Sequence, residues 1–296
     1  MSGVYRIVFL GSDAVLSLAV LAGLLARGLP VTGIVDPRAA RLDGSGPLPL
    51  KVQVPPGPLA RLARRHGIPL IHAPDPGAGD VLRALADRPA EIFLSVCFPF
   101  RLPGTLRALA ATACLNLHPS PLPAFRGPHP LFWQRRAGHR DTRMTLHAVD
   151  DTLDTGDIWA QAPCPLPDGL DFHALNAHLA AAAVPSVDAA LHRHATGALR
   201  PHPQPREGAS YQGAPGPGDF LLDTRWSALH AYNFIRAAGH WDRAFAVHAG
   251  GREFRIRRAM DYLPDARLPA PYAVDGADLY VQFNPGVLRV RETRQP

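Results

Sequence analysis

The chain has 296 residues, of which 47% are hydrophobic and 19% are charged, and this excludes a disordered chain and favours a compact globule of one or two domains. Its three cysteines are far apart and form no C-x-x-C pair, which argues against a disulfide framework or a cysteine zinc site and favours the reducing cytoplasm. The net charge of +6 favours anionic partners in general, but it comes from arginine, with Lys51 the only lysine, and does not by itself predict nucleic-acid binding.

The N-terminal stretch predicts a strand followed directly by a helix. Tyr5 to Leu10 is a short apolar run, and Gly11-Ser12-Asp13 turns into a helix that reaches Arg27, with Ser12 expected as its N-cap. The apolar part of this helix is too short to cross a bilayer of ~30 Å, so no membrane association is expected. Free N–H groups at the turn make Gly11, Ser12 and Asp13 candidates for binding an anionic part of a substrate. The full G-x-G-x-x-G pattern is missing, so a dinucleotide cofactor is not predicted.

Strands and helices then alternate. A strand at 31–35 precedes a Pro- and Gly-rich connector at 36–58, and the following segments predict helices at 59–66 and 80–87 and strands at 69–72 and 91–97. This rhythm predicts an α/β fold with an open, mainly parallel, doubly wound (Rossmann-like) sheet. Ligands are expected beyond the carboxyl ends of its strands.

A polar pair marks the end of the next strand. Ala113 to Leu117 is predicted as a strand in which Asn116 and His118, two positions apart, point to one face. Prolines at 119, 121 and 123 end the strand and predict a rigid loop. After a helix-like segment at 130–137 and a strand at 143–149, a carboxylate-rich turn at 150–157 offers Asp154.

An amide, an imidazole and a carboxylate on turns beside strands suit acyl-group transfer. Asn116 can donate an N–H to a developing oxyanion, His118 can donate a proton or positive charge, and Asp154 can orient the imidazole and raise its pKa. The residue types alone also fit a structural histidine and a solvated acidic turn, and that alternative stays open at this point.

Three segments together resemble the folate-dependent N-formyltransferases. They are Asn116-Leu117-His118-Pro119-Ser120-Pro121-Leu122-Pro123, Phe125-Arg126-Gly127 and Leu153-Asp154-Thr155-Gly156-Asp157-Ile158. The resemblance implies transfer of a formyl group from 10-formyltetrahydrofolate, as co-substrate, to a primary amine. It also implies that Asn116, His118 and Asp154 form the catalytic triad.

The resemblance further implies where the folate and the substrate bind. The exit loop of the strand at 91–97 would contribute to the pterin pocket, and Ser120 would shape the loop over the folate. The expected cofactor-binding residues are Val96, Cys97, Phe98, Leu102, Ser120 and Asp150. In purine-pathway relatives the loop that corresponds to 11–13 holds a substrate phosphate. In tRNA-acting relatives the insertion that corresponds to 36–58 is rich in lysine, whereas this chain offers only Arg38, Arg41 and Lys51 there.

The C-terminal third predicts a second, β-rich domain. A strand at 157–166 and a helix at 172–194, with a break or kink expected near Val184 because of Pro185, complete the first domain. Histidines at 178, 192 and 194 have no carboxylate or cysteine at ligand spacing, so no metal site is expected. A helix at 226–237 and four short alternating segments at 243–248, 252–259, 277–283 and 286–291 predict a small antiparallel barrel. Family members with a C-terminal domain carry an OB-like barrel there.

The sequence therefore predicts a catalytic domain at 1–200, a Pro/Gly-rich linker at 201–218 and a small C-terminal domain at 219–296. The expected activity is N-formylation of a small amine, either an amino sugar or an amino-acid derivative. Three alternatives remain: a methionyl-tRNA formyltransferase, a formyltetrahydrofolate hydrolase and a non-catalytic binding module. As a partner, tRNA is less favoured than a small amine. The oligomeric state stays open, with a homodimer as one alternative.

Overall fold

The computed structural model describes residues 5–38 and 56–292 of the chain. The chain forms two compact units, each built from segments that are separate in the sequence. Unit 1 comprises Met1–Arg126, Arg143–Pro163 and Asn176–Ala209, and unit 2 comprises Gly127–Thr142, Cys164–Leu175 and Ser210–Pro296.

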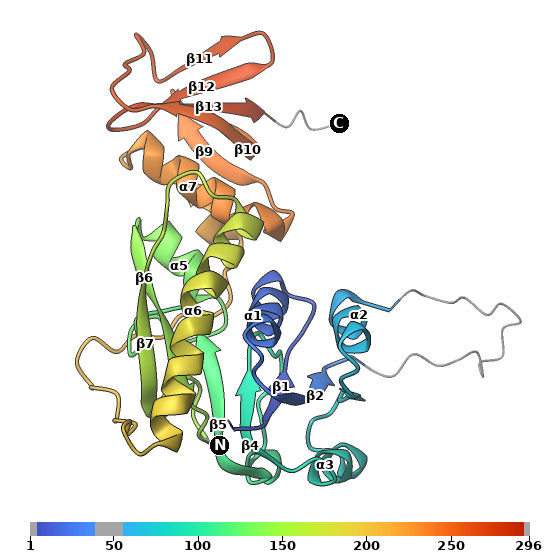
Figure 1. The fold of residues 1–296 in the computed structure, drawn as a ribbon. Coiled ribbons are helices and arrows are strands. Elements are labelled where there is room, and N and C mark those ends of the chain that lie inside the picture. Colours follow the sequence, from blue (N-terminus) through green and yellow to red (C-terminus); the bar gives the residue numbers. More distant parts are fainter. Residues whose placement is uncertain (1–4, 39–55, 293–296) are drawn as a thin grey trace, which may run out of the picture. The chain divides into compact units, whose positions relative to one another are not determined.

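A seven-stranded sheet in the order β3-β2-β1-β4-β5-β6-β7 organises the first part of the chain (Figure 1). Its strands are β1 (Ile7–Leu10), β2 (Val31–Asp36), β3 (Leu70–His72), β4 (Ala90–Ser95), β5 (Ala110–His118), β6 (Asp141–Ala148) and β7 (Ile158–Pro165). The first five pair in parallel, and β6 pairs antiparallel with β5. The predicted α/β fold with a mainly parallel sheet is confirmed.

The central strands form because they are apolar throughout. All four residues of β1 are fully buried, as are Ile92, Phe93 and Leu94 of β4. Strands covered on both faces read as continuous apolar runs, which is what parallel pairing requires. The carboxyl ends of these strands consequently meet at one edge of the sheet, where β5 brings Asn116 and His118.

Among the described residues, six helices accompany the seven strands. They are α1 (Val15–Ala26), α2 (Pro58–Arg65), α3 (Gly79–Ala86), α4 (Gly104–Arg107), α5 (Pro130–Arg136) and α6 (Phe172–Ala195). Helix α1 begins after Ala14, which takes the N-cap position, so the prediction of Ser12 as the N-cap is wrong. The Ser12 hydroxyl instead accepts from the N–H of Ala14 and donates to the Cys97 carbonyl, 2.8 Å away.

Helix α6 runs as one helix through Pro185, so a break near Val184 is wrong, and a kink there stays a prediction. It is long and apolar enough to span a membrane by length and composition alone, and half of its most apolar stretch is buried inside the protein. A Cβ at Gly23 of α1 would lie 2.7 Å from the Val184 side chain, and Arg27, the C-cap of α1, pairs with Asp188 at 2.7 Å. These contacts fix α6 against α1.

Unit 2 contains a six-stranded sheet in the order β11-β12-β13-β10-β9-β8. Its strands are β8 (Leu221–Leu222), β9 (Phe245–Ala249), β10 (Arg252–Leu263), β11 (Tyr272–Asp275), β12 (Asp278–Gln282) and β13 (Val287–Glu292). The pairing is antiparallel except between β8 and β9. Helix α7 (Ala228–Ala238) shares a core with this sheet through the buried rings of Phe234, Phe245 and Phe254.

The predicted domain boundaries remain a prediction, and the division into units differs from them in two respects, the first being that residues 201–209 of the predicted linker belong to unit 1. Residues 127–142 and 164–175 belong with the C-terminal sheet rather than with the first part of the chain. Phe132 of α5 explains part of this, because it packs on the rings of Phe220 and Phe234 at centroid distances of 5.2 Å. Closure of the second sheet into an OB-like barrel is likewise still a prediction.

Candidate active site

The three predicted catalytic side chains lie together at the carboxyl end of β5. Asn116 pairs with Ser95 of β4 on one side and with His147 of β6 on the other. His118 ends β5, and Asp154 follows β6 in the turn before β7. The Nδ1 atom of His118 is 3.7 Å from Oδ1 of Asp154.

His147 is a fourth member that the sequence did not indicate. The Asn116 side-chain amide donates to Nε2 of His147 at 3.2 Å, and that nitrogen lies 3.5 Å from Oδ1 of Asp154. Asp154 thus lies between two imidazoles, and the side chains of His118, His147 and Asp154 are all buried.

The second nitrogen of His147 determines its tautomer. Nδ1 lies 2.8 Å from the Ala148 carbonyl, which only accepts, so Nδ1 carries the proton. In the neutral ring Nε2 is then an acceptor, as the bond from Asn116 requires. One N–H of Asn116 is used to fix the amide, and the other remains to donate to a substrate oxygen.

Burial controls the charge of His118. Burial lowers the pKa of His118 below its ordinary value, while the Asp154 carboxylate and the Phe125 carbonyl oppose that shift without cancelling it. The predicted effect of Asp154, to raise the pKa of His118, is thus present but smaller than the opposite effect of burial, so the neutral ring is favoured. Nε2 of His118 lies 2.9 Å from the Phe125 carbonyl and donates to it, so the lone pair is on Nδ1, beside Asp154.

Three non-glycine residues adopt left-handed backbone conformations around this cluster. Cys97, Phe125 and Asp154 have φ values of 52°, 58° and 57°. Such conformations cost free energy outside glycine and collect at functional sites, where the surroundings enforce them. Here they occur in the exit loop of β4, in the loop after β5 and in the acidic turn.

The acidic turn is held from two sides. A Cβ at Gly156 would lie 2.1 Å from the Ala148 carbonyl oxygen, so only glycine allows the turn to approach β6 this closely. On the other side the Gln204 amide donates to the carbonyls of Asp154 and Gly156, each at 2.9 Å. Gln204 in turn accepts from Arg126 at 2.7 Å.

Gln204 comes from the segment that the sequence presents as a linker. This part of the predicted linker is attached to unit 1, because His202 also forms a backbone bridge with Ile158. The sequence contains no local signal for Gln204, since its partners are 48 and 50 positions away.

The predicted cofactor-binding residues lie near the same edge, in different environments. Val96 and Leu102 are buried, and Phe98 is half-buried and packs with Leu102 in one apolar cluster. Cys97 and Asp150 are exposed. Asp150 accepts from the hydroxyl of Thr155 at 2.9 Å and so braces the acidic turn.

Ser120 has a structural role in the loop after β5. It is fully buried, its hydroxyl donates to the Ala124 carbonyl at 2.8 Å, and its own carbonyl accepts from the Thr145 hydroxyl at 2.6 Å. These bonds shape the loop between His118 and Phe125. Direct contact of Ser120 with the folate stays a prediction.

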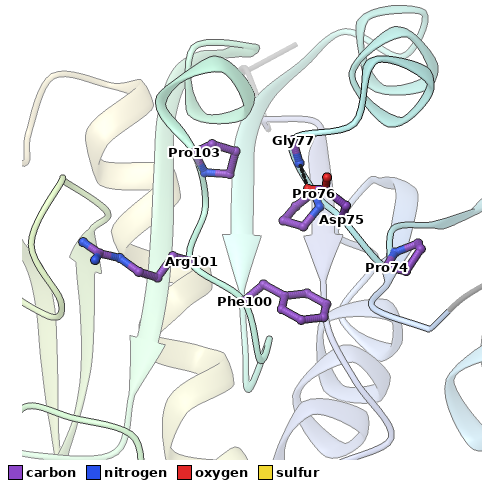
Figure 2. A pocket seen from close by; sticks show the side chains of 7 residues that line it. All are labelled: Pro74, Asp75, Pro76, Gly77, Phe100, Arg101 and Pro103. Atoms are coloured by element: carbon purple, nitrogen blue, oxygen red, sulfur yellow. Dashed lines mark hydrogen bonds between the residues drawn. The ribbon is translucent and has the colours of Figure 1, made fainter.

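A cavity of about 360 Å³ opens at the carboxyl edge of the sheet (Figure 2). Its walls are the loop after β3 and the exit loop of β4, and it is lined by Pro74, Asp75, Pro76, Gly77, Phe100, Arg101 and Pro103. Figure 2 shows the Phe100 ring directed toward the Pro74–Gly77 loop, whereas Arg101 points the other way. Arg101 donates to the Asp151 carbonyl, and this bond joins the exit loop of β4 to the acidic turn.

The predicted substrate residues at 11–13 are engaged in contacts within the protein. A Cβ at Gly11 would lie 2.3 Å from the Phe9 ring. Asp13 accepts from the N–H of Leu59 at 2.8 Å and pairs with Arg38. Asp13 thus caps α2, and substrate binding by this loop stays a prediction. Of the predicted connector, residues 39–55 lie outside the described residues.

In the two described ranges, no group of three histidine, cysteine or acidic side chains is arranged to hold a metal ion. The groups that the cluster offers for chemistry are its amide, imidazoles and carboxylate.

Comparison with known proteins gives a consistent assignment. Residues 74–187 match the family model described as "Formyl transferase". The methionyl-tRNA formyltransferase of Synechococcus sp. (strain JA-3-3Ab) is 32% identical over 82% of this chain and 78% of its own length. That of Aromatoleum aromaticum is 31% identical over 77% of this chain and 70% of its own length.

Solved structures agree at the level of the fold. An N-formyltransferase from Helicobacter canadensis, in complex with folinic acid and dTDP-3-aminofucose, superposes with a TM-score of 0.62 at 13% identity, covering 96% of this chain and 98% of its own. The sequence relatives and the fold are both those of formyltransferases, and the chain belongs to the formyltransferase family.

Proposed function

We propose that this enzyme transfers the formyl group of 10-formyltetrahydrofolate to a primary amine of a small substrate, an amino sugar or an amino-acid derivative. The observation that carries the proposal is the buried cluster at the end of β5. It combines a fixed amide donor, Asn116, with a neutral imidazole, His118, 3.7 Å from the Asp154 carboxylate.

The reaction follows from these groups. The amine nitrogen attacks the formyl carbon, and the carbonyl oxygen becomes an oxyanion that accepts the remaining N–H of Asn116. The attacking nitrogen loses its proton to Nδ1 of neutral His118, and the imidazolium that forms is stabilised by Asp154 on one side and by the Phe125 carbonyl on the other. The bond from the formyl carbon to N10 then breaks, and N10 takes up the proton. The products are a formamide and tetrahydrofolate.

A folate donor is supported by the family. The Helicobacter canadensis enzyme binds folinic acid, a formylated tetrahydrofolate. The cavity of about 360 Å³ at the carboxyl edge is in the range of small-molecule sites, but its lining contains neither the cluster at the end of β5 nor the predicted cofactor-binding residues. The assignment of Val96, Cys97, Phe98, Leu102, Ser120 and Asp150 to the folate therefore rests on the resemblance to the family.

The proposal also names the class of amine that accepts the formyl group. A small amine is favoured because the connector at 36–58 has few basic residues, and Arg38 is already paired with Asp13 and Asp36. On β10, Arg255 and Arg257 are paired with Glu253 and Asp242, which weakens the attraction of that strand for phosphates. The six-stranded sheet of unit 2 is compatible with the OB-like barrel of the family, serving structure or subunit contact.

A methionyl-tRNA acceptor is the second candidate, because the similar sequences include methionyl-tRNA formyltransferases at 31% and 32% identity. The two acceptors differ in salt dependence, since neutralising tRNA phosphates releases counterions and makes KM rise steeply with salt. A small amine bound without such contacts predicts a shallow dependence.

The test is tetrahydrofolate release from 10-formyltetrahydrofolate with a panel of nucleotide-linked amino sugars, amino acids and methionyl-tRNA. We expect amine-dependent release with a member of the amino-sugar or amino-acid group. Turnover with methionyl-tRNA alone would replace the small-amine assignment. Turnover of equal rate without any amine would indicate the hydrolase instead, because water would then be the acceptor.

A further inference from the structure

A second polar cavity lies within unit 2, between the end of α5 and the start of α7. Its volume is about 310 Å³, and it is lined by Arg135, Ala137, Gly138, His139, Arg140, Ser227, Leu229, His230 and Asn233. The two helices belong to the same compact unit, so the cavity is a feature of that unit.

Arg135 is a buried cation without a direct ion pair in the described part of the chain. Its residue exposure is 2%, and its closest acceptors are carbonyl oxygens, that of Pro167 at 2.8 Å and that of His139 at 3.4 Å. Its Nε is buried with no hydrogen-bond partner among the described residues. Leaving a guanidinium in this state is unfavourable, because a buried charge needs a counter-charge or a full set of hydrogen bonds.

The nearby Asp168 supplies only part of the missing counter-charge, because it attracts Arg135 without pairing with it directly and Arg140 repels Arg135. Asp168 pairs with Arg140 at 2.5 Å and accepts from the Asn233 amide at 2.7 Å. Arg135 and Arg140 together carry two positive charges against this one carboxylate. The cavity consequently keeps an excess of positive charge on its α5 side.

The start of α7 adds to this field. Ser227 is the N-cap of α7, and the first turn carries no acidic residue. The N–H groups of Ala228 and His230 are already bonded to the Pro285 carbonyl and to the Ser227 hydroxyl oxygen, at 2.9 and 3.1 Å, so within the described part of the chain the Leu229 N–H and the helix dipole are what this end offers an anion. On the opposite side, the backbone carbonyls of Arg135 and Arg136 at the end of α5 already accept from Nε2 of His230, at 3.1 Å and 3.0 Å. This hydrogen bonding offsets part of the repulsion between these carbonyl oxygens and a bound anion.

We infer that the cavity between α5 and α7 binds a small phosphate group, either free phosphate or the phosphoryl end of a small metabolite. Arg135 would provide the buried charge, Arg140 a second guanidinium at the mouth, and the Ser227 O–H and the Leu229 N–H the neutral donors. The inference is independent of the proposed formyl transfer, because no residue of the active-site cluster lines this cavity.

The test is calorimetric titration of the full chain with inorganic phosphate and, separately, with glycerol 3-phosphate, at constant ionic strength. We expect saturable binding of at least one of the two, and the tighter one identifies free phosphate or a phosphate ester as the ligand. Arg140→Ala should weaken binding roughly tenfold, the usual size for losing a charged hydrogen bond. Arg135→Gln should weaken it further, and both variants are checked by circular dichroism.

Arg257→Ala is the matched control. Arg257 is also exposed and paired, with Asp242 at 2.8 Å, but lies on β10 outside the cavity. We expect it to bind like the wild type. The inference is overturned by absence of saturable binding, or by equal affinities of the Arg140→Ala and Arg257→Ala proteins. These outcomes decide the question even when Arg135→Gln does not fold.

Discussion

His147 determines how Asn116 presents its amide. It pairs with Asn116 across β5 and β6 and accepts from that side chain at 3.2 Å, with its own Nδ1 proton fixed on the Ala148 carbonyl. A rotated amide would offer its oxygen, rather than an N–H, to a developing oxyanion. His147 therefore acts on the reaction through Asn116, as a positioning residue.

We expect His147→Ala to lower kcat about 10- to 100-fold, less than loss of the oxyanion donor itself, with little change in KM for the folate. His147→Gln, whose carbonyl oxygen can still accept from Asn116, should recover part of the loss. Steady-state kinetics with both variants measure this. An alanine variant that raises KM alone would show that His147 supports folate binding instead.

The neutral state of His118 predicts a defined pH profile. A base must be unprotonated to accept the amine proton, so kcat should fall as pH drops through the pKa of His118, which burial holds below its usual 6.5. The Asp154 carboxylate raises that pKa. Asp154→Asn should therefore shift the acid limb to lower pH while it reduces the plateau. A shift to higher pH would contradict this account.

At the level of elements, Gln204 fixes the acidic turn within unit 1. Its amide donates to the Asp154 and Gly156 carbonyls, while Arg126 donates to its oxygen. The left-handed backbone of Asp154 has to be stabilised by such external contacts.

Gln204→Ala should reduce kcat about tenfold, because two hydrogen bonds that hold the carboxylate beside His118 are lost. Gln204→Glu is the sharper variant. It keeps an acceptor for Arg126 but has no N–H for the two carbonyls, so we expect it to be no better than alanine. A fully active Gln204→Glu enzyme would show that the bonds to the turn are dispensable.

The elements that sequence could predict are those with local patterns. The apolar runs of β1 and β4 and the period-2 spacing of Asn116 and His118 are local, and they predicted the sheet and the end of β5. The bond from Asn116 to His147 depends on strand register, and Gln204 acts over about fifty positions. Neither has a local pattern. Helix α6 passes through Pro185 because packing against α1 overrides the preference of a single residue.

At the scale of the molecule, the assignment of residues 127–142 to unit 2 was also beyond the sequence. It depends on Phe132 entering an aromatic cluster with Phe220 and Phe234. Domain boundaries are predicted from sequence where the composition changes, as it does at a linker. Packing between residues that are far apart in the sequence does not change the local composition, so it cannot be predicted in this way.

Buried histidines in unit 2 make its stability depend on pH. Burial lowers the pKa of His129 and of His230, so the folded unit binds these protons more weakly than the unfolded chain. The free energy of unfolding is then highest above the ordinary pKa of about 6.5 and falls as pH decreases below it. Urea denaturation of a Trp159→Phe chain at pH 7.5 and 5.5 in phosphate-free buffer, followed by the fluorescence of Trp133, Trp226 and Trp241, which all lie in unit 2, measures the difference.

His230→Gln should make this pH dependence shallower. Glutamine has an N–H to donate to the α5 carbonyls but does not titrate between these pH values. An unchanged slope in this variant, or greater stability at pH 5.5 than at pH 7.5 in the Trp159→Phe chain itself, would contradict the assignment.

The cluster at the end of β5 is tested most directly by the formyl-transfer kcat of Asn116→Ala, His118→Ala and Asp154→Ala, measured with 10-formyltetrahydrofolate and the best amine of the panel. Each variant should keep the circular dichroism spectrum of the wild type and lose about 10²- to 10³-fold in kcat, the usual effect of removing a group that stabilises the transition state. A near-normal kcat in any one of them would contradict the account.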